Sequence, residues 1–191
     1  MDRLMKDADR FNQWLPLAGI VVTGAVMPMP VLAAQYFTVE MVQKALFPDA
    51  QEFVRRSVNL TLEQRKFIEA SSPTRTPFPD QGIWEAHRGG ALLGYVVVDQ
   101  VFGKHEFITY ATALTPDGAV KQIEIMDYRE TYGYEVRNEK WRQQFVGKKF
   151  GAPVKVDADI QNIGGATLSS VHMAEGVRRI LAIHQAVLKG S

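Results

Sequence analysis

The spacing of apolar residues divides the chain into helical and strand-like regions. Apolar positions recur at helical spacing over residues 38–47 and again, after a capping box that begins at Thr61, through Ile68. A proline-rich stretch without periodicity follows at 71–82, which is typical of a surface loop. These patterns predict two short helices and a loop ahead of the main domain.

Strand-like patterning dominates the middle of the chain, where β-branched and aromatic residues are enriched. Four strands are predicted there, at residues 83–88, 91–102, 105–115 and 119–128. A Gly-Gly pair joins the first two strands, and a Thr-Pro-Asp-Gly turn joins the last two. Links this short connect only antiparallel neighbours, so the pattern predicts an antiparallel sheet of about four or more strands.

Helical spacing returns in the last third of the chain. A short helix is predicted at 138–145 and a long one over about 168–188, whose apolar stripe includes His184 and leaves Arg178 and Arg179 outside it. The order of the elements predicts an α+β fold, in which helices flank the sheet and the long C-terminal helix packs on it.

The N-terminal segment carries no charged residue from Trp14 to Ala34. It ends in Ala33 and Ala34, small residues of the kind found at the cleavage site of a secretory signal. We therefore predict a signal peptide cleaved near these alanines, with a retained membrane anchor over 14–34 as the alternative. Either outcome places the rest of the chain in the periplasm or on the extracytoplasmic face of the inner membrane. The predicted organisation is a leader at 1–34, an N-terminal helical segment and loop at 35–78, and a main domain at 79–191.

Composition excludes several classes of function. Among 191 residues, 22 lysines and arginines stand against 21 aspartates and glutamates, and this net charge of +1 argues against a dedicated nucleic-acid binder. A chain without cysteine forms no disulfides, thiolate metal sites or cysteine nucleophiles. The four histidines lack ligand spacing, so no metal site is predicted, and His105 is expected to be an ordinary strand histidine.

Candidate chemistry lies in the loop at 159–170, directly before the predicted C-terminal helix. Two glycines there permit close backbone approach, and three hydroxyls follow where the free N–H groups of the helix emerge. A helix N-terminus of this kind favours a phosphate group. The alternative is an ordinary glycine turn in which Thr167 or Ser169 caps the helix.

Four short sequence motifs between residues 80 and 190 occur in the order in which they are found in one protein family. Residues 165–167 (Gly-Ala-Thr) resemble a flavin-attachment motif, 130–133 (Glu-Thr-Tyr-Gly) resemble a Glu-Thr-x-Gly turn, and 141–148 resemble a Phe-x-Gly-Lys segment. Residues 93–95 (Leu-Gly-Tyr) resemble an early sheet block. The chain thus resembles the FMN-binding domain family, which includes freestanding periplasmic proteins and the flavinylated subunits of the Rnf complex and of the sodium-pumping NADH:quinone reductase.

The resemblance implies a covalently bound flavin. In that family an FAD-dependent flavin transferase esterifies the threonine of a (Ser/Thr)-Gly-Ala-Thr motif to the phosphate of FMN, which assigns the role of acceptor to Thr167. The chain departs from the family at Gly164, where serine or threonine is usual. It departs again at Gln161, where an aspartate is usual, and Asp159 lies two residues earlier.

The resemblance also implies a set of residues around the flavin, with Tyr134 as a further aromatic candidate. The predicted cofactor-binding residues are Thr167, Gly164, Gly165, Ala166, Leu168, Ser169, Ser170, Glu130, Thr131, Tyr132, Tyr128 and Trp141. The stretch from Arg137 to Lys155 contains six basic residues and one glutamate, a net charge of +5. Such a stretch favours binding of a flavin phosphate or an anionic partner. A solvated basic face is the alternative interpretation of this stretch.

Three functions are consistent with these features. In the first, the protein is an exported flavoprotein that carries electrons to a membrane or periplasmic redox partner. The second is a sensory or interaction module of the same fold that binds FMN without a covalent bond. The third is a flavin-dependent reductase of a small acceptor.

Overall fold

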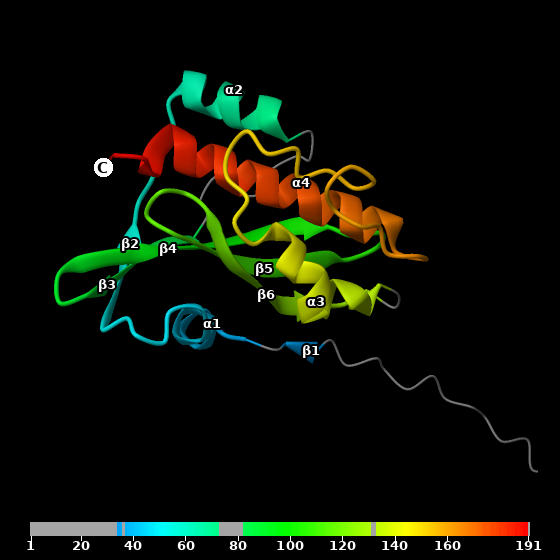
Figure 1. Cartoon of the computed structure of the whole chain (residues 1–191), viewed down its shortest axis with the longest axis horizontal. Helices are drawn as coiled ribbons and strands as arrows, with labels where there is room; N and C mark the ends of the chain where they lie inside the picture. The colour runs from blue at the N-terminus through cyan, green and yellow to red at the C-terminus, as the bar shows by residue number, and fades with distance from the viewer. Residues whose placement is uncertain (1–33, 36, 73–81, 131–132, 191) are drawn as a thin grey trace, which may run out of the picture. The chain divides into compact units, whose positions relative to one another are not determined.

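An antiparallel sheet forms the centre of the computed structural model, which describes residues 34–190 except 36, 73–81 and 131–132 (Figure 1). Over these residues the strand order is β1-β6-β5-β4-β3-β2, with every neighbouring pair antiparallel. The strands are β1 Ala34–Gln35, β2 Glu52–Arg56, β3 Gly82–Arg88, β4 Ala91–Phe102, β5 Phe107–Leu114 and β6 Val120–Tyr128. The predicted α+β class and the predicted central strands are confirmed.

Neither edge strand was predicted: β2 lies in the segment predicted to hold helices and a loop, and β1 lies at the predicted boundary between the leader and that segment. Strand β2 pairs with β3, and its burial does not alternate along Glu-Phe-Val-Arg-Arg, so the sequence lacks the period-two signal of a half-buried strand. Strand β1 is two residues long and pairs Ala34 with Tyr128 and Gln35 with Asp127 of β6. A pair of residues is too short to leave any periodic signal.

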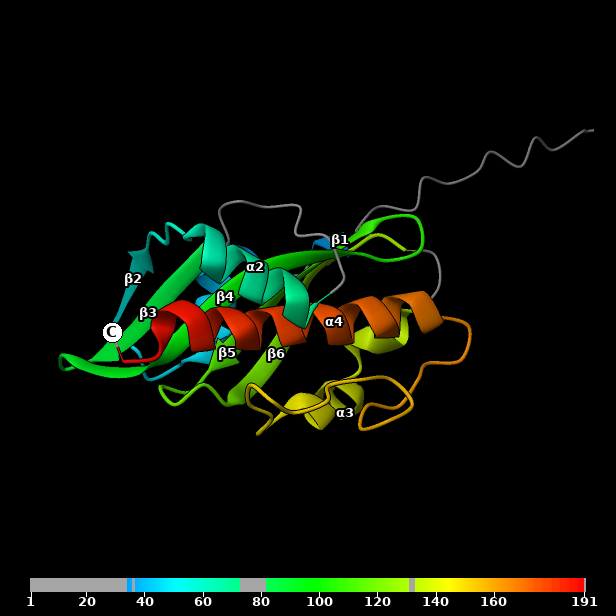
Figure 2. The ribbon, with the colours of Figure 1, turned by 90° about the horizontal axis from the view of Figure 1, so that it is seen from above.

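Helices cover both faces of the sheet. Helix α1 (Val39–Leu46) packs on one face, where Val42 and Leu46 are fully buried. Helix α4 (Thr167–Ile183), which continues as a π-helical turn over His184–Leu188, packs on the other face (Figures 1 and 2). Helix α2 (Leu62–Ser71) lies against α4, and the short α3 (Glu139–Arg142) lies between the 3-10 turns Tyr134–Arg137 and Gln143–Phe145.

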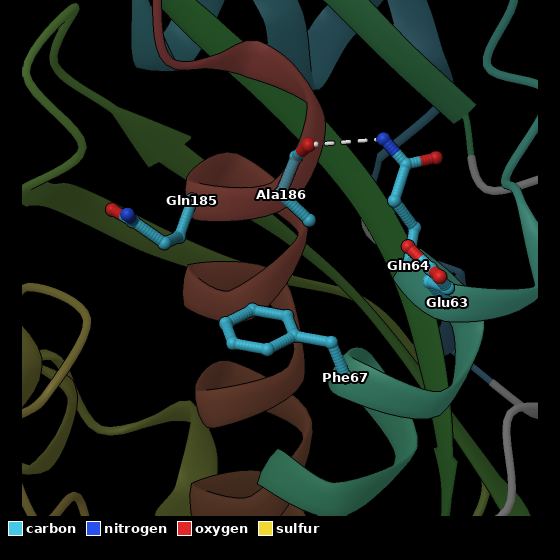
Figure 3. A pocket seen from close by; sticks show the side chains of 5 residues that line it. All are labelled: Glu63, Gln64, Phe67, Gln185 and Ala186. Carbon is cyan, nitrogen blue, oxygen red and sulfur yellow. Dashed lines mark hydrogen bonds between the residues drawn. The ribbon is translucent and has the colours of Figure 1, made fainter.

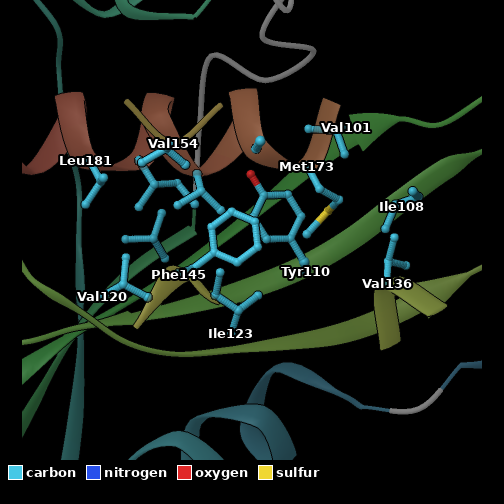
Figure 4. Packing of buried hydrophobic residues seen from close by; sticks show 14 of the residues in the cluster. Val101, Ile108, Tyr110, Val120, Ile123, Val136, Phe145, Val154, Met173 and Leu181 are labelled. Atoms are coloured by element: carbon cyan, nitrogen blue, oxygen red, sulfur yellow. The ribbon is translucent and has the colours of Figure 1, made fainter. Parts of the chain in front are cut away.

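The larger part of the core fills the space between α4 and the sheet. Phe145, Tyr110 and Met173 are fully buried there and lie side by side (Figure 4). Burial of large apolar side chains is the main stabilising term of such a layer. Among the helices of the described residues, none has the length and apolar character needed to cross a membrane.

A buried ion pair fastens α4 to the sheet. Arg179, predicted to lie outside the apolar stripe, is only 1% exposed, and its Nη2 lies 2.6 Å from Oδ2 of Asp99 in β4. The Tyr110 hydroxyl donates to the same carboxylate at 2.9 Å. Gly176 makes room for this ring, because a Cβ there would lie 2.2 Å from the Tyr110 hydroxyl. The prediction for Arg179 is wrong because a sequence pattern does not reveal a buried partner on another element.

Candidate functional site

Segments far apart in the sequence meet in one cavity at the N-terminal end of α4. The cavity has a volume of about 270 Å³ and lies between the first turn of α4, the β4–β5 turn and the chain that follows β6. The residues that line it are Lys104, His105, Glu130, Gly165, Ala166, Thr167, Leu168 and Ser169. Six of these eight were predicted from the sequence as cofactor-binding residues.

The loop that enters α4 leaves the first helical N–H groups without a capping side chain. Gly165 adopts a left-handed conformation (φ +80°), and the N–H of Ala166 donates to the Ile163 carbonyl at 3.0 Å. Ala166 is the N-cap, and no side chain among the described residues caps the helix there. The alternative of Thr167 or Ser169 as N-cap is therefore wrong. The uncapped N–H groups and the helix dipole favour an anion at this position.

The three hydroxyls of this loop differ sharply in exposure. Thr167 is exposed, whereas Ser169 is 2% exposed and Ser170 is fully buried. The Ser170 hydroxyl lies 2.9 Å from Oδ1 of Asn162, and Nδ2 of Asn162 lies 3.4 Å from Oγ1 of Thr167. Asn162 thus bridges the buried hydroxyl and the exposed one, although the sequence offered no reason to select it.

The Glu-Thr-x-Gly turn packs directly against this loop. Gly133 has φ +85°, and a Cβ there would lie 2.4 Å from Cβ of Ala166 and 2.9 Å from the Tyr128 hydroxyl. Tyr128 is buried without lining the cavity, and its phenol hydrogen-bonds to Ser169, which does line it. Burial raises the pKa of Tyr128 to about 12, so its hydroxyl stays protonated at physiological pH.

Glu130 organises the opposite wall of the cavity. Its Oε1 accepts hydrogen bonds from three consecutive backbone N–H groups of the β4–β5 turn, those of Lys104, of His105 at 2.6 Å and of Glu106 at 3.1 Å. Gly103 permits this contact, because a Cβ there would lie 2.4 Å from the same oxygen. Burial opposes ionisation of Glu130, but these hydrogen bonds outweigh it and lower its pKa. Glu130 is thus an ionised carboxylate that fixes a turn of the cavity wall.

The β4–β5 turn brings two basic side chains to the cavity, Lys104 and His105. His105 lies in an exposed turn, so the prediction of a strand histidine is wrong. Three of the six basic residues in the stretch from Arg137 to Lys155 form ion pairs away from the cavity: Arg142 pairs with Glu124, Lys148 with Asp159, and Lys149 with Asp117. The two basic side chains that line the cavity therefore come from a turn that was not among the predicted cofactor-binding residues.

Several predicted residues lie away from the cavity or outside the described residues. Trp141 is buried against Phe145, and its Nε1 donates to the Gln161 carbonyl at 2.8 Å, so its position is that of a core residue. Tyr134 is exposed and is not a lining residue. Gly164 and Ser170 belong to the loop without lining the cavity. Thr131 and Tyr132 lie outside the described residues.

A second cavity, of about 340 Å³, lies at the other end of α4 (Figure 3). It is lined by Glu63, Gln64, Phe67, Gln185 and Ala186. The Gln64 amide donates across it to the Ala186 carbonyl at 3.1 Å, which joins α2 to the end of α4. Among the described residues, its lining has one carboxylate and no basic side chain, so this cavity does not suit a phosphate.

Comparison with known proteins agrees with the site geometry. Residues 103–182 match the model of a family described as the FMN-binding domain. The match begins at the β4–β5 turn and ends in α4, so it contains all eight residues that line the cavity. Residues 103–182 are thus similar to the FMN-binding domain family. The resemblance seen in the sequence is thereby confirmed.

The chain as a whole is also similar to proteins of nearly its own length. The chain is 24% identical over 182 residues to a subunit of the proton-translocating ferredoxin:NAD(+) oxidoreductase complex of Clostridium ljungdahlii, a match that covers 92% of this chain and 93% of the relative. Among solved structures, the crystal structure of Shewanella oneidensis NqrC matches with 18% sequence identity and a TM-score of 0.48. That match covers 82% of this chain and 87% of NqrC.

Proposed function

We propose that this protein is an exported flavoprotein that carries electrons outside the cytoplasmic membrane, with FMN joined by a phosphoester to Thr167 of its FMN-binding domain. One observation carries the proposal. Of the three hydroxyls at the start of α4, Thr167 is exposed at the cavity, whereas Ser169 and Ser170 are buried and hydrogen-bonded within the protein. A hydroxyl must be accessible to be esterified by another enzyme.

The residues around the cavity suit a flavin phosphate. The uncapped N–H groups of the first turn of α4 lie on one side, and Lys104 and His105 lie on the other. The exposed side chain of Leu168 adds an apolar surface at the same place. A cavity of about 270 Å³ is smaller than the roughly 300–1,000 Å³ of typical ligand sites, so it encloses only part of such a group. Bound FMN would supply reversible electron transfer, and a partly exposed ring is accessible to a redox partner.

The attachment step proceeds with FAD as the donor in the reaction of an FAD-dependent flavin transferase. A bond forms between Oγ1 of Thr167 and the phosphorus of the FMN half, the pyrophosphate bond breaks, and AMP leaves. The Thr167 hydroxyl gives up its proton to a base of the transferase or to solvent. The Asn162 amide lies 3.4 Å from Oγ1, and a hydrogen bond between them would favour one orientation of the threonine side chain.

The departures from the family pattern are compatible with this role. A Cβ at Gly164 would meet no atom of the described residues within 4 Å, which leaves space for the side chain of a serine or threonine. Asp159 is committed elsewhere, since it accepts from Lys148 at 2.7 Å and from the Lys155 N–H at 2.7 Å. In this chain the Asn162 side chain contacts Thr167.

Export and a membrane redox partner complete the proposal. The uncharged segment at 14–34, within the leader proposed at 1–34, would direct the chain across the membrane, whether it is cleaved near Ala34 or retained as an anchor. The relative from Clostridium ljungdahlii is a subunit of an oxidoreductase complex. By analogy, this protein would exchange electrons with a redox partner in or at the membrane.

The proposal is tested by producing the exported protein together with a flavin transferase. We expect denatured protein to keep flavin fluorescence and to gain the mass of FMN less one water, and Thr167→Val to lose both signals. A colourless wild-type protein would contradict covalent attachment. If free FMN then raises the melting temperature of that unmodified protein, the non-covalent module becomes the better account.

A further inference from the structure

Strand β2 leaves one edge of the sheet open. It is the last strand in the order β1-β6-β5-β4-β3-β2, and no other strand within the described residues pairs with its outer side (Figure 2). Its five residues pair with β3 in one continuous register, without a bulge, and none of them is proline. Bulges, prolines and charged side chains are the usual protection of an edge, whose outward N–H and C=O groups otherwise pair with another strand. Only charged side chains are present in β2, so its backbone is open to a further strand.

The side chains of β2 alternate between the two faces of the sheet. On the face covered by α1, Phe53 packs against the apolar cluster, and the Arg55 guanidinium lies 5.9 Å from the ring centroid of Trp84. The remaining three residues of the strand lie on the other face, and they are Glu52, Val54 and Arg56. Val54 is 42% exposed, so an apolar side chain lies uncovered in the middle of the open edge.

The sequence of β2 is complementary to itself when two copies run antiparallel. Hydrogen-bonded and non-hydrogen-bonded pairs alternate in an antiparallel ladder, so a twofold axis between two identical strands must pass through a residue paired with itself. An axis through Val54 pairs Glu52 with Arg56 of the second copy and Phe53 with Arg55 of the second copy. It also brings the two exposed Val54 side chains together. Opposite charges and apolar groups directly across a ladder stabilise the pairing.

The neighbouring registers lack this complementarity. An axis through Arg55 places the two Arg55 side chains opposite each other, and like charges directly across a ladder are destabilising. An axis through Phe53 places Glu52 opposite Val54 and forms no charge pair within the strand. The charges that discourage other pairings of this edge therefore select the register centred on Val54.

We propose that β2 is a self-association surface, through which two copies of this chain pair antiparallel over Glu52–Arg56 with Val54 on the twofold axis. The net charge of +1 imposes little repulsion between the copies. Five paired residues in each copy make a small interface, so the dimer exchanges rapidly with the monomer. None of these residues lines the cavity at α4, and the proposal is independent of the flavin.

A chain without cysteine allows this pairing to be trapped by single introduced cysteines. Opposed Cα atoms in an antiparallel ladder lie about 4.5–5.5 Å apart, within the roughly 4.4–6.8 Å that a disulfide requires. Val54→Cys therefore places two thiols together across the axis. Val146→Cys is the matched control, because Val146 is an equally exposed valine (43%) on another part of the surface. The exported protein is oxidised with copper–phenanthroline, and the dimer is measured on non-reducing gels.

We expect Val54→Cys to form a disulfide-linked dimer at least about tenfold faster than Val146→Cys, since pairing raises the effective concentration of its thiol. Glu52→Cys and Arg56→Cys should each cross-link poorly alone, because the axis separates each position from its own copy by about 14 Å along the strands. An equal mixture of these two variants should cross-link efficiently. Adding Glu52→Lys to Val54→Cys should slow the reaction, because it places lysine opposite Arg56.

Equal rates for Val54→Cys and Val146→Cys would overturn the proposal and leave β2 unpaired or occupied by a strand of a different protein. Cross-linking of Glu52→Cys with itself as fast as with Arg56→Cys would contradict the register. An unchanged rate after Glu52→Lys would contradict the pairing of Glu52 with Arg56. None of these measurements needs bound flavin, so their outcome is separate from whether Thr167 is esterified.

Discussion

Gly133 and Ala166 lie so close together that a Cβ on Gly133 would be 2.4 Å from the Cβ of Ala166. This contact joins the turn after β6 to the loop that carries the proposed flavin acceptor. Because Gly133 also has φ +85°, two separate constraints require glycine at this position. The spacing of the two motifs in the sequence thus reflects a direct contact in the fold.

Gly133→Ala should lower the free energy of unfolding by more than left-handed backbone strain alone would, because the added Cβ also collides with Ala166. Gly147→Ala is the matched control, because Gly147 has φ +80° and nothing within 4 Å of a Cβ. We expect the control to lower the free energy of unfolding by about 1 kcal/mol through left-handed strain alone. Overpacking against Ala166 should raise the loss for Gly133→Ala to roughly 2–4 kcal/mol. Urea denaturation of both variants measures the difference, and equal losses would contradict the contact.

Glu130→Gln should loosen the β4–β5 turn. The substitution removes the charge that strengthens hydrogen bonds from the N–H groups of His105 and Glu106, and we expect a loss of about 1–2 kcal/mol in stability. Hydrogen exchange should report faster exchange of these amides in the variant. Unchanged protection of both amides would show that the carboxylate does not hold the turn.

The same carboxylate predicts a dependence of stability on pH. The pKa of Glu130 is lowered from its usual value of 4.5, so the ionised form is favoured in the folded state. Its contribution is fully present above pH 4.5 and is lost as the pH falls through the lower folded-state pKa. Melting temperatures measured between pH 3 and 7 should converge for wild type and Glu130→Gln at the acidic end. Parallel curves would contradict this origin of the pH dependence.

The buried ion pair between Arg179 and Asp99 should be essential for packing α4 on the sheet. Arg179→Met leaves the Asp99 carboxylate buried without its cation, and we expect a loss of about 3–5 kcal/mol. Arg178→Met is the neighbouring control, because Arg178 is partly exposed and lies 3.8 Å from Glu175, and it should cost less than about 1 kcal/mol. Similar losses for both variants in urea denaturation would contradict a special role for Arg179.

Two substitutions near Thr167 should change flavin incorporation in opposite directions. Asn162→Ala removes the amide that contacts Oγ1 of Thr167 and should slow incorporation roughly tenfold through a misplaced acceptor. Gly164→Ser restores the usual family residue in open space and should speed it. Incorporation is followed by in-gel flavin fluorescence, with circular dichroism to establish that each variant is folded. If Asn162→Ala incorporates flavin at the wild-type rate, Asn162 does not position the acceptor.

Much of the architecture was predictable because it depends on local signals. The strands β3 to β6 have strong β-branched patterns and recognisable turns, and the capping box at Thr61 does begin α2, with Thr61 bonded to Gln64. The acceptor loop was predictable for the same reason, since glycines and hydroxyls before an amphipathic helix are contiguous in sequence. Edge strand β2 was missed because its burial does not alternate.

The rest of the site depends on contacts between residues distant in sequence. Lys104 and His105 enter the cavity because Glu130 holds the β4–β5 turn, an interaction across about 25 residues. Arg179 is buried because Asp99 lies opposite it, 80 residues away. Neither interaction has a local signature, so the sequence pattern placed His105 in a strand and Arg179 outside the apolar stripe. Long-range pairing of this kind emerges only once the sheet is assembled.

Esterification of Thr167 is tested most directly by mapping the modified peptide after co-expression with a flavin transferase. Trypsin releases one peptide that spans 156–178 and contains Thr167 together with Ser169 and Ser170. Tandem mass spectrometry should show the mass of FMN less one water on Thr167 and no modification of either serine. An unmodified peptide, or flavin on Ser169 or Ser170, would contradict the proposed attachment.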